Sequence, residues 1–372
     1  MIIQETNPLE MASLHIVYDN LSPLDEADGK HGSCHLIEHM IGKAVDPIAP
    51  TLYESGINSD YCVNYELVEA SFIGTAETLE KLAPVIVQQI VNSDANRFTE
   101  EDFESERNAV INEVGLLGAD LMQQPLQQGT FKIYGLHGPE GILEDFRGYS
   151  FDEFKRDYER LIAHPSRIVY IGPRKVHFPE IKFSERRPFR QIVPCKSMCE
   201  TPIIPQTYDI DEYNSVVFIG TEPIVGDRDY AAMVLATKML TGNDEAVLLE
   251  QLRTKDGLVY SCGGSIEALR NTGILVYRTT TAARNTEKVI HSMSKILENP
   301  ELYLTKDHFE RTRLYLGAIQ KVSRILRYCN CNDLVRKGMI TYEHDLLDIE
   351  YPEFMEISKK YLCLGKFCPF VG

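Results

Sequence analysis

The chain has 372 residues, of which 44% are hydrophobic and 25% are charged, and its formal net charge is −17. This composition is ordinary for a soluble globular protein and the length is enough for two domains. The excess of acids argues against a nucleic-acid-binding protein, which needs a basic face. It is compatible with an interior that attracts cationic peptides, although solubility alone is the simpler reason for most of the charge.

Segments that would direct the chain to a membrane or out of the cell are not expected. There is no run of about 20 apolar residues, which a membrane-spanning helix needs. The first basic residue is Lys30, whereas secretory and mitochondrial leaders carry early positive charge. The nine cysteines are scattered and odd in number, which predicts reduced thiols and a cytoplasmic location. The pairs Cys195/Cys199 and Cys329/Cys331 lack the usual spacing of zinc-binding cysteines, so a second metal site there is a minor alternative.

Hydrophobic periodicity predicts the secondary structure of the first half. The expected elements are, in order, a strand over 12–18, a short buried helix over 31–42, strands over 57–65 and 67–74, helices over 78–92 and 98–121, a helix over 151–162 and a strand over 167–172.

The second of these elements carries the segment HGSCHLIEHMIGK, with three histidines and one glutamate in nine positions. On a helix, His35 and His39 lie one turn apart on one face, so both imidazoles can bind a single Zn²⁺. Glu38 lies beside that face and could take a proton from water at the metal without being a ligand. A surface helix that happens to carry histidines is the alternative, and His31 and Cys34 are competing ligands in principle.

A catalytic zinc site needs a third protein ligand, and the segment FTEEDFESERNAVINEVGLLGADL offers one. Thr99 can cap the start of this helix, and the acids that follow it suit the positive end of the helix dipole. Glu106 and Glu113 lie two turns apart on one face, and either could reach the metal. Acids on an ordinary solvated helix face are the alternative.

The second half starts a new series of elements after residues 173–208, which are rich in proline and basic residues and are predicted to be a linker. The expected elements are a strand over 214–220, helices over 228–241 and 244–254, strands over 258–266 and 272–280, and helices over 285–298, 306–327 and 352–361.

Both halves follow the order strand, helix, two strands, helix, long helix, which indicates a structural repeat. The tandem strands are typical of antiparallel hairpins. We therefore predict an α+β fold of two homologous sandwich domains, each a mixed, mostly antiparallel sheet with helices on one face. The first domain is expected over 1–172 and the second over 209–372, and the first alone carries the HxxEH motif.

The sequence HLIEH, followed 74 residues after its second histidine by the last glutamate of ERNAVINE, resembles the pitrilysin/insulinase family of zinc peptidases. This resemblance implies Zn²⁺ as the cofactor and His35, His39 and Glu113 as its ligands. It implies that Glu38 is the general base and that Glu106 is a supporting residue near the metal.

The resemblance extends over most of the chain and includes a segment of the second half. LLEQLRTKDGLVYSCGG is similar to the segment that contributes an arginine and a tyrosine to the family's active site, which implies these roles for Arg253 and Tyr260. Tyr260 alone could equally be a strand residue of the core. The family's architecture implies a clamshell around a cavity, with a peptide substrate bound as an extra strand near Asn58.

These features predict a zinc-dependent endopeptidase for short or unfolded peptides, such as leader or processing peptides. Family members of this length usually pair, so a homodimer or a heterodimer with a related subunit is expected. The presence of both the zinc motif and Arg253/Tyr260 favours a homodimer or a self-sufficient chain. The loop IGKAVDPIAPT departs from the family's usual sequence. A non-catalytic or conditionally active subunit of a peptidase complex is the main alternative, and a zinc hydrolase of other substrates is a minor one.

Overall fold

The structure is a computed structural model that describes residues 1–118, 120, 122–185, 192–194, 213–242, 245–269, 272–325, 335 and 346–372. The cysteine pairs 195/199 and 329/331, much of the predicted linker and the end of the predicted helix 306–327 lie outside these residues. The chain forms two compact units. Unit 1 comprises Met1–Leu116, His137–Arg190 and Ser323–Lys337, and unit 2 comprises Leu117–Leu136, Gln191–Val322 and Gly338–Gly372.

The sheet of unit 1 has five strands in the order β1-β5-β2-β4-β3, and only β1 and β5 run parallel. Successive side chains alternate between its faces, and one face buries Leu14, Ile16 and Phe72 against the helices. The strands are β1 (Ile2–Thr6), β2 (Met11–Tyr18), β3 (Asn58–Asn64), β4 (Leu67–Thr75) and β5 (Arg167–Gly172).

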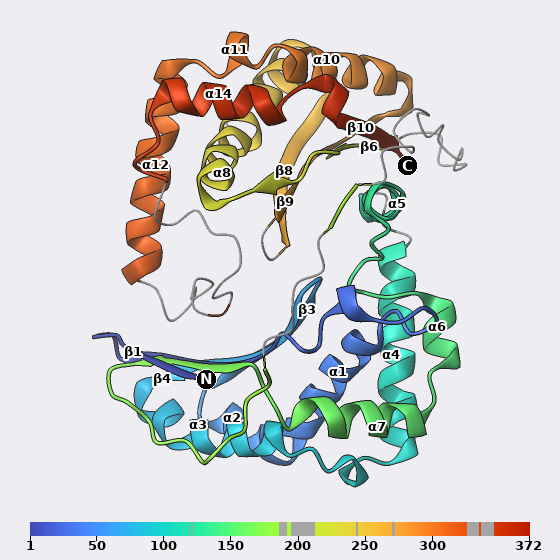
Figure 1. Cartoon of the computed structure of the whole chain (residues 1–372), viewed down its shortest axis with the longest axis vertical. Helices are drawn as coiled ribbons and strands as arrows, with labels where there is room; N and C mark the ends of the chain where they lie inside the picture. The colour runs from blue at the N-terminus through green and yellow to red at the C-terminus, as the bar shows by residue number, and fades with distance from the viewer. Residues whose placement is uncertain are drawn as a thin grey trace. The chain divides into compact units, whose positions relative to one another are not determined.

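The helices of unit 1 gather on that buried face of the sheet (Figure 1). They are α1 (Ser33–Val45), α2 (Ala49–Glu54), α3 (Ala76–Val91), α4 (Glu100–Gly118), α6 (Leu143–Gly148) and α7 (Phe151–Ile162). The predicted cap of α4 is confirmed, since the Thr99 hydroxyl accepts a hydrogen bond from the Asp102 amide at 3.1 Å. The predicted end of α1 at Gly42 is wrong. The helix continues to Val45 because Ala44 and Val45 are buried in the core of unit 1, and this packing stabilises the last turn.

The sheet of unit 2 is antiparallel, with the order β10-β6-β9-β7 and with β8 paired to β9. Its strands are β6 (Tyr213–Gly220), β7 (Ile224–Val225), β8 (Val259–Leu269), β9 (Thr272–Ala282) and β10 (Phe367–Val371). Its core is completed by α8 (Asp227–Thr241), α9 (Val247–Leu249), α10 (Thr286–Glu298), α11 (Pro300–Tyr303), α12 (Lys306–Ile325) and α14 (Tyr351–Tyr361).

One helix of unit 2, α5 (Gln123–Tyr134), comes from the first half of the sequence. The Tyr134 hydroxyl donates to the carbonyl of Gly220 in β6. A Cβ on Gly129 would lie only 2.5 Å from the side chain of Ile219. Ile219 points away from its neighbour Phe218, which is in the core, so α5 covers the second face of this sheet. The predicted domain boundaries placed residues 117–136 in the first domain, and the packing of α5 groups them with unit 2.

The two units repeat one antiparallel arrangement, in which β5-β2-β4-β3 of unit 1 matches β10-β6-β9-β8 of unit 2. In each unit the matching strand that comes first in the sequence, β2 or β6, precedes a helix, α1 or α8. The strands β3 and β4 form a hairpin in unit 1, and β8 and β9 form one in unit 2. The predicted α+β class with two sheets and their helices is confirmed. Among the described residues, no helix is long and apolar enough to span a membrane.

Candidate metal centre

The N-terminus of α1 is held by the buried carboxylate of Glu26. This carboxylate accepts hydrogen bonds from the amides of Gly32 at 2.8 Å and Cys34 at 2.7 Å, and from the Ser33 hydroxyl at 3.1 Å. Gly32 has φ +105, and a Cβ there would clash with the ring of Phe146. The first turn of α1 is therefore fixed by hydrogen bonds on one side and by packing on the other.

His35 is the most buried histidine of the helix, with 3% of its surface exposed. Its Nδ1 lies 2.9 Å from the carbonyl oxygen of Glu140. A carbonyl can only accept, so Nδ1 carries the proton and Nε2 keeps a free lone pair. Burial lowers the pKa of His35, which favours this neutral form.

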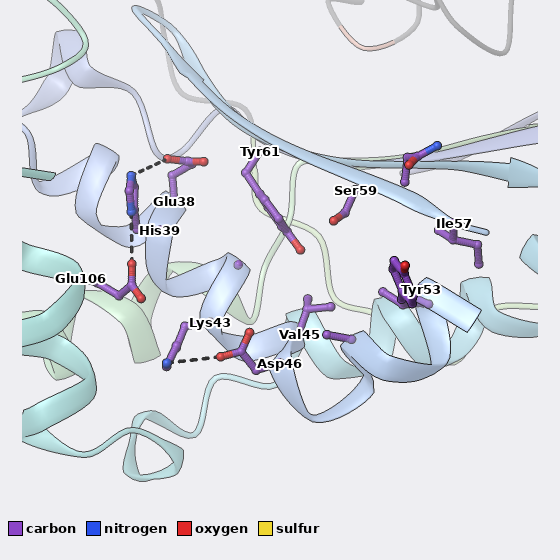
Figure 2. Close-up of a pocket in the computed structure, with 14 residues that line it drawn as sticks. Glu38, His39, Lys43, Val45, Asp46, Tyr53, Ile57, Ser59, Tyr61 and Glu106 are labelled. Atoms are coloured by element: carbon purple, nitrogen blue, oxygen red, sulfur yellow. Dashed lines mark hydrogen bonds and ion pairs between the residues drawn. The ribbon is translucent and has the colours of Figure 1, made fainter. Parts of the chain in front are cut away.

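His39 lies one turn further along α1 and is oriented by a different partner. Its Nδ1 is 3.3 Å from the carboxylate of Glu106 on α4, as Figure 2 shows. Its Nε2 is 3.4 Å from the carboxylate of Glu113, and the Nε2 of His35 is 3.6 Å from the same oxygen. Glu106 and Glu113 thus reach the histidines from positions two turns apart on one face of α4, as their spacing predicted.

His35, His39 and Glu113 form a group whose ligand atoms all lie within 4.8 Å of one another. Two imidazoles and one carboxylate are a donor set typical of zinc. Ligands at 2.0–2.1 Å around a tetrahedral ion stand about 3.4 Å apart, close to the separations between Glu113 and the two imidazoles. The residues therefore fit a zinc ion with one coordination position left open. His31 and Cys34, the competing ligands in principle, are not part of this group.

The carboxylate of Glu38 lies beside this group and not within it. Its Oε2 is 4.0 Å from Nε2 of His35 and 3.9 Å from Nε2 of His39, and the residue is 8% exposed. Burial raises the pKa of Glu38 to about 7 in spite of the opposing influence of His39. Glu38 is therefore a buried carboxyl beside three candidate metal ligands, a position suited to a general base that acts on water.

A pocket of about 590 Å³ adjoins this centre within unit 1 (Figure 2). It is bounded by the second half of α1, by α2 and by the first residues of β3. Glu38, His39 and Glu106 form its end at the metal centre, and Tyr53 and Ile57 are among the residues at the other end. The pocket is lined by Glu38, His39, Gly42, Lys43, Val45, Asp46, Ala49, Leu52, Tyr53, Ile57, Asn58, Ser59, Tyr61 and Glu106.

The structure places the remaining predicted residues at distinct points. Asn58 is exposed at the start of β3, the edge strand of its sheet, and lines the pocket. Arg253 and Tyr260 belong to unit 2. Arg253 lies in a π-helical segment, Glu250–Lys255, and its guanidinium stacks over the Tyr260 ring at 4.9 Å. Tyr260 is 80% exposed, which contradicts the alternative that it is a core residue of the strand.

Two residues of the centre were not predicted from the sequence. Glu140 orients His35 through its backbone carbonyl, so its residue type gives no signal. Glu26 lies before the helix and acts through side-chain capping. The glycines near Gly141 could have indicated that this segment passes close to the start of α1. A Cβ on Gly141 would lie only 2.4 Å from the Cα of Gly32.

Comparison with known proteins gives a family match in the second half of the chain. Residues 177–316 match the Peptidase M16 inactive domain. The Peptidase M16 match does not include the HxxEH segment or α4. No curated protein matches the chain by sequence.

Solved structures share the whole fold at low sequence identity. A protease from Helicobacter pylori has a TM-score of 0.78 at 14% identity, over 100% of this chain and 96% of the other. A peptidase M16 inactive domain from Pseudomonas fluorescens has a TM-score of 0.73 at 14% identity, over 100% and 94%. A chain of complex III2 from Candida albicans, with Inz-5 bound, has a TM-score of 0.77 at 11% identity, over 100% and 93%.

These comparisons support a Peptidase M16 relationship and the two-unit fold. The matched model is that of an inactive domain, and it covers residues 177–316 only. At such low identities the structural similarity carries the fold alone.

Proposed function

We propose that the chain is a zinc-dependent endopeptidase that cleaves short or unfolded peptides, with Glu38 as the general base. The proposal rests on one observation, the convergence of His35, His39 and Glu113 with the Glu38 carboxylate alongside. A zinc ion bound by these three ligands would supply a Lewis acid and lower the pKa of water.

The residues of the chain account for proton transfer and orientation. Glu38 accepts the proton of the attacking water and returns it to the leaving amine. Its buried carboxylate lies 4.0 and 3.9 Å from the two imidazole Nε2 atoms, close enough to take a proton from a water bound at the same centre. Glu140 and Glu106 hold the two imidazoles through Nδ1, and such partners orient metal ligands and raise their basicity.

The edge of the first sheet offers a place for an extended substrate. Within the described residues, β3 pairs with β4 alone, and Asn58 begins this edge strand at the mouth of the pocket. A peptide that adds to such an edge is bound through its main chain and can carry varied side chains. This mode of binding selects for extended, unfolded peptides, since a folded chain has its backbone already paired.

We assign the stabilisation of the tetrahedral oxyanion to Tyr260, with Arg253 as its stacked neighbour. This role follows from the resemblance of LLEQLRTKDGLVYSCGG and from the exposure of the Tyr260 ring. Loss of one such donor typically lowers kcat by about 10²–10³. Tyr260→Phe should therefore lower kcat by this factor and leave the metal content unchanged.

The decisive experiment compares the wild type with Glu38→Gln on a library of unstructured peptides, with bound zinc measured in both. We expect about one zinc per chain in each protein and cleavage by the wild type only. Glu104→Gln, which removes a carboxylate paired with Arg107 on α4, is the matched control and should cleave normally. Absence of zinc from wild type in zinc-containing buffer would remove the metal site, and cleavage by Glu38→Gln would remove its role as base.

A second candidate function is a non-catalytic or conditionally active subunit of a peptidase complex. The match of residues 177–316 to a domain of the inactive type favours it. The matched segment does not include His35, His39 or Glu113. The match therefore does not exclude a working metal centre in unit 1. Zinc binding by wild type and Glu38→Gln without cleavage by either would support this candidate. Activity that appears when a related subunit is added would identify a heterodimer, whereas activity of the chain alone would favour the homodimer or a self-sufficient enzyme.

A further inference from the structure

We propose that the pocket beside the metal centre binds a lysine or arginine side chain of the substrate, at one of the two residues that flank the scissile bond. Gly42 sets the size of this pocket and Asp46 contributes to its charge. The inference rests on the proposed peptidase function, because it names the substrate residue that the same centre would select.

The position of the pocket ties it to the scissile bond. Glu38 and His39 line it at one end, and the edge strand β3 contributes Asn58, Ser59 and Tyr61 along its side. A peptide held along β3 with its reactive carbonyl at Glu38 has a side chain directly over this pocket. The residue that enters must therefore adjoin the bond that is cleaved.

The depth of the pocket depends on the absence of a side chain at Gly42. An added Cβ would lie 3.5 Å from the Tyr61 ring, which is ordinary van der Waals contact. Alanine therefore fits without displacing any neighbour. A longer side chain would extend from this point into the pocket and reduce the space left for a substrate side chain.

The charges around the pocket are mostly negative. The Nζ of Lys43 is 3.3 Å from Asp46 and 3.5 Å from Asp102, so its positive charge is already shared by two carboxylates. The positive charge of a bound metal ion would balance the negative charges of Glu38 and Glu113. Asp46 and Glu106 then remain in the pocket lining with Lys43, and Asp102 lies beside the same lysine. Among the charged side chains described around Lys43, negative charge is therefore in excess.

The walls suit the stem of a long basic side chain. Val45, Leu52 and Ile57 give apolar surface, and Tyr53 and Tyr61 add aromatic rings. A lysine or arginine buries its methylene groups against such surfaces while its charged end reaches a carboxylate. Aromatic faces add cation–π attraction for the same end. A glutamate of similar length would meet uncompensated like charge.

The test uses internally quenched peptides that differ only at the residues flanking the cleaved bond. Lysine is compared with norleucine, which has the same stem without the charge, and with glutamate and alanine. We expect lysine to be preferred over norleucine, and glutamate to be the poorest, at one of the two flanking positions. Norleucine equal to or better than lysine at both positions would overturn the charge assignment.

Variants of the pocket lining give the second arm of the test. Gly42→Leu should reduce cleavage of the lysine peptide at least about tenfold while the alanine peptide is still cut. Glu104→Gln, which changes a carboxylate of α4 outside the pocket lining, is the matched control and should behave as wild type. Asp46→Asn should lower the preference for lysine over norleucine by about two- to fivefold, and Lys43→Gln should raise it. An unchanged preference in Gly42→Leu would overturn the assignment of the pocket.

A binding measurement separates this inference from the proposed function. Fluorescence anisotropy with the lysine and norleucine peptides is measured on the zinc-loaded Glu38→Gln variant, with and without Gly42→Leu. If no peptide is cleaved by wild type but lysine binds better and the difference disappears with Gly42→Leu, the peptidase function fails and the pocket stands. If peptides are cleaved without preference at either flanking position, the function stands and the pocket inference fails.

Discussion

The two units share a four-stranded antiparallel core, yet their corresponding helices carry different chemistry. In unit 1, the helix α1 follows strand β2 and carries His35, Glu38 and His39. In unit 2, the corresponding helix α8 has the sequence DRDYAAMVLATKMLT, with nothing that binds zinc at equivalent spacing. Buried apolar residues of α8, among them Ala232, Leu235 and Met239, pack into the core of unit 2 instead.

The long helices that follow differ in the same way. In unit 1, α4 presents Glu106 and Glu113 to the histidines of α1. In unit 2, α12 buries Thr312 and His308, and the Nε2 of His308 has no hydrogen-bond partner among the residues that the structure describes. The two units therefore share one backbone plan and differ in a few side chains, and among the described residues those of unit 1 form a group that fits a metal ion.

The largest expected effect comes from removing the proposed ligand on α4. Glu113→Gln replaces a carboxylate with a neutral amide, so stoichiometric zinc binding and any cleavage should both be lost. Bound zinc per chain measures this directly. Glu310→Gln on α12, which removes the partner of Arg313, is the matched control in unit 2 and should keep its zinc. Equal zinc in Glu113→Gln and wild type would place the third ligand elsewhere.

A smaller effect is expected from Glu106, which contacts Nδ1 of His39 and is not one of the three candidate ligands. Glu106→Gln should weaken zinc affinity by about 10- to 100-fold, the range typical of residues that hold a metal ligand in place. Competitive titration against a zinc chelator gives this factor. A loss as complete as that of Glu113→Gln would show that Glu106 is itself a ligand.

The sequence could predict the parts of this comparison that depend on residue type and spacing. The i and i+4 spacing of His35 and His39, and the seven-residue spacing of Glu106 and Glu113, fix which side chains share a helix face. Repeated element order also revealed the two-unit plan. Predicted strands and helices agree with most elements of both units, because alternation and helical periodicity are set by burial on one face.

The missed features depend on contacts between distant segments. The helix α5 has few apolar residues, so its sequence gives little sign that it is packed. In the structure, Gly129 lies against Ile219 of β6 and Phe370 of β10, and Tyr134 donates a hydrogen bond to β6. The strand β10 contains Pro369, which argues against a strand except at a sheet edge, and an edge is where it lies. The carbonyl of Glu140 acts through the backbone, which sequence patterns do not report.

The third prediction tests whether α5 belongs to unit 2 in energetic terms. Gly129→Leu places new atoms where Ile219 and Phe370 already lie, so it should lower the free energy of unfolding by about 1–3 kcal/mol. Zinc affinity should stay near that of wild type, because the change is made within unit 2. Gly118→Ala, where an added Cβ meets open space, is the control, and thermal unfolding with zinc titration measures both. A loss of zinc affinity with unchanged stability would mean that α5 belongs with unit 1 and not with unit 2.

The smallest expected effect concerns His308, the buried histidine of α12. Burial lowers its pKa, so the folded chain binds a proton less readily at this site than the unfolded chain does. The stability that depends on a neutral His308 is therefore present above the unfolded pKa of about 6.5 and is lost as the pH falls through and below it. His308→Leu should reduce the loss of stability between pH 7.5 and pH 5, measured by urea unfolding with a chelator present. Because both proteins keep His35 and His39, the difference between their pH slopes reports His308 alone, and identical slopes would mean that this buried histidine is protonated as readily in the folded chain as in the unfolded one.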